Sequence, residues 1–338
     1  MKALHSIKDS MTTNFCTLFD SNYLSRGLAL YRSLVATGED FRLYVFCFDD
    51  TTYTVLSRLN LDRIALVRLV DFESPDLLRV KTGRTKAEYC WTCTSHSIRY
   101  ALDAFSLPEV TYLDADLFFY APPSILLDEF DRSGASVLIT PHRYTRRYDI
   151  SWRSGIYCVQ FITFRADERG LRALDWWRER CLEWCHARVE NGKFGDQKYL
   201  DDWPTRFPGV HVLEHLGGGV APWNVQQYVI EKNNRLMGRE KRTSRRFEVV
   251  FFHFHNVRFL TDGYLDLGDY YLRPSIKRAF FQPYVAALEQ AAEDIRGVDA
   301  TIDPHGIHTP AASALQSLLR LRRRWMKNYL LYDKFRRL

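Results

Sequence analysis

The stretch VTYLDADLFFY, residues 110–120, decides how the chain is interpreted. Its β-branched and aromatic residues predict a buried strand, and Asp114 and Asp116 stand one residue apart at the end of that strand. Two carboxylates in such a place need a counter-charge. Hard oxygen ligands at this spacing suit Mg²⁺ or Mn²⁺, ions that often bind a phosphorylated substrate as well. A strand that ends in a solvated Asp-x-Asp turn explains the same residues without a metal.

The segments that precede this stretch predict an α/β fold. Strand patterns alternate with helical patterns at residues 14–19, 24–35, 42–48, 52–59 and 65–70. This β-α-β-α-β order is typical of a mostly parallel sheet flanked by helices. Ligands of such sheets bind beyond the carboxyl ends of the strands. We therefore expect Asp20 and Tyr23, which follow the first strand, to share a crevice with Asp114 and Asp116.

The later segments continue the same alternation. Helices are predicted at residues 94–105, 125–130 and 166–189, strands at 135–140, 157–164 and 248–255, and a mainly helical pattern beyond residue 273. Alternation in the last strand sends His253 and His255 to the same side. The basic loop at 141–147 is either a substrate contact or a solvated turn. Gly217–Gly219 either lets the backbone approach a ligand closely or forms a surface turn.

Length and composition fit an enzyme-sized α/β protein. The chain has 338 residues, of which 46% are hydrophobic, enough for a full core. We predict a catalytic domain over residues 1–272 and a helical C-terminal extension over residues 273–338. No stretch has the length of uncharged apolar residues that a membrane span needs, and the first residues lack the apolar core of a signal peptide. These features predict a cytoplasmic protein.

The seven cysteines give no disulfide framework, because their number is odd and most stand in apolar segments. One alternative is a zinc site. Cys90 and Cys93 have the spacing of a ligand pair, and Cys181 and Cys185 stand beside His186. However, the first pair lacks the glycines of a zinc knuckle, and the second pair falls one turn apart in a helical pattern. We therefore favour reduced core cysteines.

Positive charge is concentrated at the C-terminal end. Residues 320–338 contain eight Lys and Arg against one Asp, which gives this segment a net charge of +7. Since the whole chain has a net charge of +6, the remaining residues together carry −1 and are near neutral. A nucleic-acid partner is not expected, because it needs a basic face on the folded body. As a helix, residues 314–338 would place leucines and aromatics opposite arginines. That pattern predicts a helix on an anionic membrane surface, or one docked on the protein's own core.

Taken in order, five elements resemble one family of glycosyltransferases with the GT-A fold. An acidic residue and an aromatic follow the first strand, an Asp-x-Asp follows a later strand, and Asp-Gln, aromatic-Asn and His-containing elements come after these. In this chain they are Asp20–Tyr23, Tyr112–Asp116, Asp196–Gln197, Ala221–Asn224 and His253–Asn256. The chain resembles the retaining, metal-dependent family that includes glycogenin and bacterial lipopolysaccharide galactosyltransferases. Asn256 replaces the glycine usual in that family.

The resemblance implies a set of site residues. Asp114, Asp116 and either His253 or His255 would hold Mn²⁺, or Mg²⁺, and a buried structural histidine explains either imidazole equally well. Asp196 would bind hydroxyls of the donor sugar, and Gln197 would lie near its anomeric carbon. Contacts to the nucleotide sugar would come from Asp20, Tyr23, Arg84, Arg99, Asp114, Trp223, Asn224 and Arg258. Solvated surface charge is the competing explanation for Arg84 and Arg99.

The activity implied is transfer of a sugar from a nucleotide-diphosphate sugar, most simply a UDP-hexose, to a glycan or lipid-linked glycan. Retention of anomeric configuration and a role in synthesis of bacterial surface polysaccharide such as lipopolysaccharide are also implied by the resemblance. Placement on the inner face of the plasma membrane would follow from the basic tail. Two alternatives stay open: a nucleotidyltransferase that makes nucleotide sugars, and a non-catalytic protein that binds them.

Overall fold

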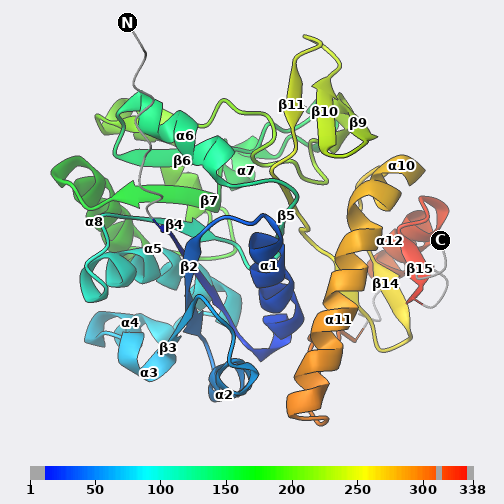
Figure 1. Ribbon diagram of the computed structural model, residues 1–338, viewed down its shortest axis with the longest axis horizontal. Helices are drawn as coiled ribbons and strands as arrows, with labels where there is room; N and C mark the ends of the chain where they lie inside the picture. The colour runs from blue at the N-terminus through cyan, green and yellow to red at the C-terminus, as the bar shows by residue number, and fades with distance from the viewer. Residues whose placement is uncertain (1–11, 310–313, 333–338) are drawn as a thin grey trace, which may run out of the picture.

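A mostly parallel sheet forms the centre of the computed structural model, which describes residues 12–309 and 314–332 (Figure 1). Within these residues the sheet has the strand order β3-β2-β1-β4-β7-β6-β8. Strands β1 to β4 and the β6/β8 pair run parallel, and β7 is antiparallel to both β4 and β6. The strands are β1 (Thr13–Phe19), β2 (Phe41–Cys47), β3 (Ile64–Arg68), β4 (Glu109–Leu113), β6 (Val137–Pro141), β7 (Tyr157–Arg165) and β8 (Val210–Val212).

Helices cover both faces of this sheet (Figure 1). One face packs against α1 (Leu24–Ala36), α2 (Asp50–Leu59) and α6 (Ser124–Ser133). The other packs against α3 (Leu69–Phe72), α4 (Pro75–Lys81), α5 (Lys86–Ala104), α8 (Glu168–Glu183) and α9 (Trp203–Arg206). Side chains alternate between the two cores, as Phe15 and Cys16 of β1 show. The predicted α/β fold is therefore confirmed.

The stretch at residues 110–120 is divided by the acidic residues. Strand β4 ends at Leu113, and the chain turns through Asp114–Asp116 before β5 (Leu117–Phe119) leaves the main sheet. Strand β5 pairs antiparallel with β12 (Phe251–His253), and His253 stands opposite Leu117. The register of this small sheet therefore carries a histidine to the acidic turn.

Three predicted boundaries were wrong. Helix α5 begins eight residues before the predicted start, because Thr85 and Glu88 form a reciprocal N-terminal cap. Helix α8 ends at Glu183 rather than residue 189, where Trp184 adopts an extended conformation. The predicted strand 248–255 is two short strands, β11 (Arg246–Glu248) and β12, separated by Val249 and Val250.

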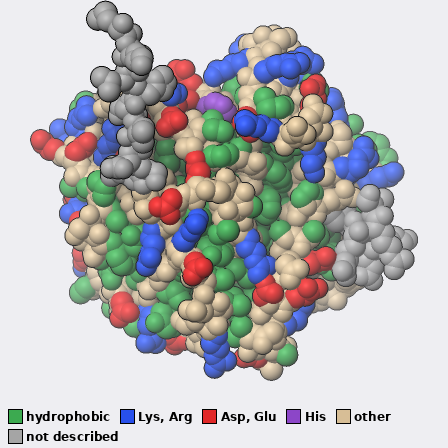
Figure 2. Space-filling model, in the orientation of Figure 1, with side chains coloured by type: hydrophobic (Ala, Val, Ile, Leu, Met, Phe, Trp, Pro, Cys, Tyr) green, Lys and Arg blue, Asp and Glu red, His purple; other side chains and the backbone are tan. Residues whose placement is uncertain are grey.

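A small antiparallel sheet projects from the body (Figure 1). It contains β9 (Tyr228–Lys232), β10 (Leu236–Glu240) and β11. Figure 2 shows Lys and Arg side chains gathered on this projection. Its exposed basic residues include Lys232, Arg235, Lys241, Arg242, Arg245 and Arg246. Positive charge is thus present on the folded body as well as in the tail.

The C-terminal part packs back on the α/β body. A short helix α10 (Pro274–Ile276) and a π-helical turn lead into α11 (Gln282–Val298), which lies along α1. Strand β14 (Tyr264–Asp266) pairs with both β13 (Arg258–Phe259) and β15 (Tyr329–Leu331). Helix α12 (Ala314–Trp325) precedes β15. The predicted tail helix 314–338 is therefore wrong beyond Trp325, and its residues 333–338 lie outside the described part of the chain.

Candidate active site

The acidic turn lies at the carboxyl end of β4, and backbone hydrogen bonds hold it on both sides. The Asp114 N–H donates to the carbonyl oxygen of Gln160 over 3.0 Å, and the Phe254 N–H donates to the carbonyl oxygen of Asp116 over 3.0 Å. Strand β7 and the segment after β12 thus hold the backbone of the turn from which both carboxylates project. Ligand sites of open α/β sheets lie at this edge.

His253 joins the two carboxylates. Its Nε2 lies 3.0 Å from Asp116 Oδ1 and 3.8 Å from Asp114 Oδ2. The opposite ring nitrogen, Nδ1, lies 2.6 Å from the side-chain oxygen of Gln160. Because an amide oxygen can only accept, Nδ1 carries the proton. The neutral tautomer of His253 therefore presents a lone pair on Nε2 to the carboxylates.

Burial and mutual attraction set the charges of this group. Burial raises the pKa of Asp114 to about 6, against the opposing attraction of His253. Burial would also raise the pKa of Asp116, but the attraction and hydrogen bond of His253, together with the charges of His255 and Arg26, outweigh burial, so this pKa is lowered. Although burial would lower the pKa of His253, the nearby Asp116 carboxylate raises it well above the usual value. Without another cation, a proton on His253 balances the acidic pair.

The donor set fits a divalent cation. Two carboxylates and one imidazole are ligands that Mn²⁺ or Mg²⁺ accepts in proteins. The second nitrogen of a ligating imidazole is commonly bonded to an oxygen atom, as Nδ1 of His253 is here. The thiol of Cys158 lies within 4.8 Å of the nearest donor atoms of Asp114 and His253. Burial raises the pKa of that thiol, which favours the neutral form over a thiolate ligand.

His255, the other predicted metal ligand, lies on the same side as His253. Their ring centroids are 5.9 Å apart, and both rings meet Trp223 edge-on. Burial lowers the pKa of His255 to about 4, so it is neutral at physiological pH. In the described part of the chain its ring makes no hydrogen bond, whereas His253 bonds directly to the acidic turn. The geometry therefore favours His253 as the metal ligand.

Trp223 and Asn224, predicted to contact the nucleotide sugar, lie beneath the two histidines, and both side chains bond to the protein backbone. Trp223 Nε1 and Asn224 Nδ2 each donate to the carbonyl oxygen of His142 over 2.9 Å. Asn224 is fully buried and bonds in addition to the backbone of Gly219 and Ala221. The protein thus uses all hydrogen-bonding atoms of the Asn224 side chain. In this structure Asn224 holds the backbone at His142, Gly219 and Ala221 in place.

Asp196 lies close enough to Asp114 for the two carboxylates to repel. It is buried, and the Trp177 indole donates to its backbone oxygen over 2.9 Å. Burial, with the charge of Asp114 as a second cause, raises the pKa of Asp196 to about 7. Gln197 follows at the start of a short 3-10 helix. The half-buried Gln197 side chain makes no hydrogen bond to any described residue, which leaves its amide free for a ligand.

Asp20 and Tyr23 occupy the turn after β1. The N–H of Asn22 donates to Asp20, and Lys86 of α5 forms an ion pair with the same carboxylate. Tyr23 is 40% exposed and stacks against the guanidinium of Arg26, 4.5 Å from the ring centre. The charges of Asp114 and Asp116 act on the Tyr23 hydroxyl. Tyr23 is therefore within electrostatic range of the acidic pair, while Asp20 is paired with Lys86.

The structure does not bring Arg84 and Arg99 to this group. The guanidinium of Arg84 bonds to Thr92 and to the carbonyl oxygen of Leu182. Arg99 bonds to Asp103 and Asp175, on α5 and α8. Both arginines therefore join helices on the outer side of the sheet. Arg258 is exposed at the start of β13, after the strand β12 that carries His253. Its guanidinium donates to the side-chain oxygen of Asn256 over 3.1 Å.

The seven cysteines are free, as the sequence analysis favoured, and the glycines at 217–219 are placed by the structure as well. Among the described residues, one group of three His, Cys, Asp or Glu side chains has donor atoms that all lie within 4.8 Å of one another, namely Asp114, Cys158 and His253. Asp116 meets His253 directly but is not part of that group, and the four cysteines considered for zinc form no such group. The glycines at 217–219 are buried and approach protein rather than ligand. A Cβ on Gly217 would lie 1.8 Å from the backbone oxygen of Glu248.

Gln160 is the functional residue that the sequence interpretation missed. It is fully buried in the middle of β7, and its amide nitrogen has no hydrogen-bond partner within the described residues. A glutamine in the apolar run YCVQFITF was the available signal, because a buried amide needs a partner. That partner is His253, 93 residues away in sequence.

The fold has clear counterparts among solved structures. Galactosyltransferase LgtC, in complex with donor and acceptor sugar analogs, superposes with a TM-score of 0.55 over 85% of this chain and 100% of LgtC, at 12% identity. An active-site mutant of LgtC gives a TM-score of 0.50 over 82% of this chain and 96% of its own, at 10% identity. At these identities the likeness establishes the GT-A fold.

Relatives by sequence come from Bacillus subtilis (strain 168). The uncharacterized protein YfnF is 33% identical over 260 residues, which cover 74% of this chain and 84% of YfnF. The uncharacterized protein YfnD is 28% identical over 309 residues, 88% of this chain and 96% of YfnD. No family model matches the chain. The chain thus belongs to the family of YfnF, and its fold is the GT-A fold of the LgtC-type glycosyltransferases.

Proposed function

We propose that the protein is a metal-dependent glycosyltransferase that takes a sugar from a nucleotide-diphosphate sugar, most simply a UDP-hexose. The observation that carries this proposal is the group formed by Asp114, Asp116 and His253 at the carboxyl edge of a GT-A sheet. When bound there, Mn²⁺ or Mg²⁺ would offset the charge that develops on the leaving diphosphate. Gln160 supports this by keeping the Nε2 lone pair of His253 directed at the carboxylates.

The remaining site residues position the donor. The bond between the anomeric carbon and the diphosphate oxygen breaks with its electron pair on the diphosphate. A bond from the acceptor hydroxyl oxygen to the anomeric carbon forms, and the hydroxyl proton passes to the leaving diphosphate. Asp196 would accept hydrogen bonds from donor hydroxyls in its ionised form, and Gln197 would lie at the anomeric carbon. Since an amide is a poor nucleophile, attack on the same face of the sugar with retention accounts better for Gln197 than a covalent intermediate does. Asp20 and Tyr23 would contact the nucleotide.

We further propose a glycan or lipid-linked glycan as acceptor, in bacterial surface polysaccharide synthesis at the cytoplasmic face of the plasma membrane. No helix among the described residues combines the length and apolarity needed to cross a bilayer. However, α12 exposes Leu318, Leu321 and Trp325, and its arginines Arg322 and Arg324 are exposed beside them. Apolar and basic side chains on one short helix suit a surface of anionic lipid.

The test is release of nucleotide from a panel of UDP-, GDP- and ADP-hexoses, with Mn²⁺ and with a chelator. The proposal predicts Mn²⁺-dependent release of nucleoside diphosphate from one donor, and loss of that release in Asp116→Asn. Release of pyrophosphate from a sugar phosphate and a nucleoside triphosphate would identify a nucleotidyltransferase instead. Tight binding without either product would identify a non-catalytic binding protein.

A further inference from the structure

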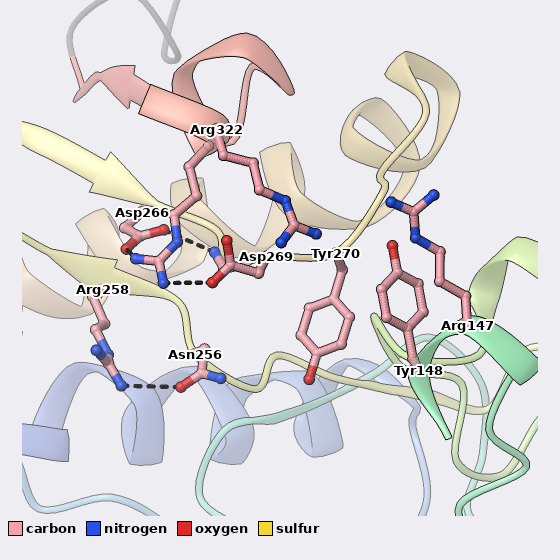
Figure 3. A pocket seen from close by; sticks show the side chains of 10 residues that line it. Arg147, Tyr148, Asn256, Arg258, Asp266, Asp269, Tyr270 and Arg322 are labelled. Atoms are coloured by element: carbon pink, nitrogen blue, oxygen red, sulfur yellow. Dashed lines mark hydrogen bonds and ion pairs between the residues drawn. The ribbon is translucent and has the colours of Figure 1, made fainter. Parts of the chain in front are cut away.

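A polar cleft of about 350 Å³ is lined in part by Asn256 and Arg258, which follow His253 in the chain. We call it the arginine pocket. Three parts of the chain build it: the loop before α7 (Ser151–Ser154), the segment from Asn256 to Tyr270, and helix α12 (Figure 3). Its lining residues are Arg147, Tyr148, Asn256, Arg258, Asp266, Gly268, Asp269, Tyr270, Arg322 and Arg323.

The acidic residues of the arginine pocket are already paired. Arg323 bonds to Asp266 and to Asp269, over 2.6 Å in each case. These bonds fasten α12 to the α/β body, and the single charge of Arg323 offsets half of the charge of the two carboxylates. Arg323 is therefore a structural anchor, and the four arginines of the pocket exceed its two aspartates in number.

Three further guanidinium groups line the pocket without a carboxylate partner among the described residues. Arg258 bonds only to the amide oxygen of Asn256, and Arg147 lies over the ring of Tyr148 at 5.8 Å. Arg322 projects from α12 toward Tyr270, with its guanidinium free in the cleft (Figure 3). Like charges gathered around one cavity are unfavourable unless an anion is bound between them.

The chemistry of the lining favours a phosphate group. A guanidinium group can donate two parallel hydrogen bonds to two phosphate oxygens. A phosphate, with two negative charges and more oxygens, can bind several guanidinium groups at once, whereas a carboxylate has one charge and two oxygens. Tyr148 and Tyr270 meet edge to face at 5.1 Å and form the apolar side of the pocket. A phosphorylated sugar combines the charge and the apolar ring face that this lining can contact.

The position favours the acceptor over the donor. Of the residues that the resemblance assigns to the nucleotide sugar, only Arg258 lines the pocket, whereas Asp20, Tyr23 and the metal-ligand group do not. Asn256 and Arg258 follow His253 by three and five residues, so the pocket begins where the metal site ends. A molecule held by Arg147 and Arg322 would approach the reacting carbon from outside the donor site.

We propose that the arginine pocket binds a phosphate group carried by the acceptor, with Arg147 and Arg322 as recognition residues. This inference rests on the proposed function, since it assigns the pocket to the second substrate of the same reaction. It also gives α12 a role in substrate binding, in addition to its exposed apolar side chains.

The experiment uses glucose 1-phosphate as the probe and isothermal titration calorimetry as the readout. The full chain is first saturated with UDP and Mn²⁺, so that the donor's phosphate site is filled. Arg322→Ala and Arg147→Ala are compared with wild type and with Arg132→Ala, which removes an exposed arginine from α6 on the other side of the molecule (Figure 1). Glucose serves as the uncharged control ligand.

Wild type and Arg132→Ala should bind glucose 1-phosphate and not glucose, and each pocket variant should bind it about tenfold or more weakly. UDP affinity should stay within about twofold in all variants. Equal binding by the pocket variants, no binding by wild type, or displacement of the probe by UDP would overturn the proposal. If UDP does not bind at all, the proposed function fails, and titration without nucleotide still tests whether Arg147 and Arg322 bind phosphate.

Discussion

Replacing Asp196 with Asn should stabilise the metal-free protein, and increasingly so as the pH rises. The Asp196 carboxylate is buried, and burial together with the charge of Asp114 raises its pKa from 3.8 to about 7. The folded protein therefore binds a proton more readily than the unfolded chain. Stability is highest when Asp196 is protonated and is lost as the pH rises from about 4 to 7. Asn keeps the shape of the protonated acid but cannot ionise.

The size of the effect follows from this pKa difference. One pKa unit corresponds to about 1.4 kcal/mol, so complete ionisation of Asp196 costs roughly 4 kcal/mol of folding free energy. Part of this cost is already present at pH 5, where the unfolded carboxylate is ionised. Between pH 5 and pH 8 the advantage of Asp196→Asn should grow by about 2 to 3 kcal/mol. For a chain of this length, that corresponds to about 3 to 4 °C in melting temperature.

The assay is differential scanning calorimetry of wild type and Asp196→Asn at several pH values, with a chelator present. Asp128→Asn is the matched control, because Asp128 is exposed on α6. Its melting temperature should follow that of wild type at every pH. A gap between Asp196→Asn and wild type that stays constant from pH 5 to pH 8 would refute the assignment of Asp196 as a destabilised, buried carboxylate.

Three other predictions concern the metal and the tail. Gln160→Leu should weaken Mn²⁺ binding about 10- to 100-fold in calorimetric titration, because Nδ1 of His253 loses its acceptor; unchanged affinity would contradict that positioning role. Mn²⁺ affinity of wild type should fall as the pH drops through about 6, since protons on Asp114 and on the raised-pKa His253 compete with the ion; a flat profile from pH 8 to pH 5 would show that other residues bind it. Serine at both Leu321 and Trp325 should reduce sedimentation with anionic liposomes, and salt should weaken binding of wild type; equal sedimentation of both proteins would rule out α12 as the contact.

The fold could be predicted because each strand is marked by the residues of its own short segment. Buried strands such as β1 and β4 contain continuous apolar runs, and the acidic pair falls where β4 ends. The break between β4 and β5 was not predicted, because apolar residues continue on both sides of the acidic turn. The early start of α5 was predictable in principle, since Thr85 and Glu88 have the spacing of a capping box.

Site residues could be predicted from the sequence only where the residue type itself indicates a partner, such as a metal ion for two neighbouring carboxylates. Asp114, Asp116 and His253 are residues that need partners, and the structure brings them together. Arg84 and Arg99 are arginines whose partners lie on other helices, and local sequence does not show which charge an arginine will meet. Likewise, α12 ends at Trp325 because Lys327 takes a left-handed conformation, and β15 then pairs with β14.

We propose that the acidic pair and His253 hold a nucleoside diphosphate through a divalent ion. Calorimetric titration of UDP tests this most directly, with Mn²⁺ or with a chelator, in wild type and in Asp116→Asn. We predict that Mn²⁺ increases the UDP affinity of wild type at least about tenfold, and that Asp116→Asn abolishes this increase while its circular dichroism spectrum stays that of wild type. UDP affinity that is the same with Mn²⁺ and with the chelator in wild type would contradict the claim.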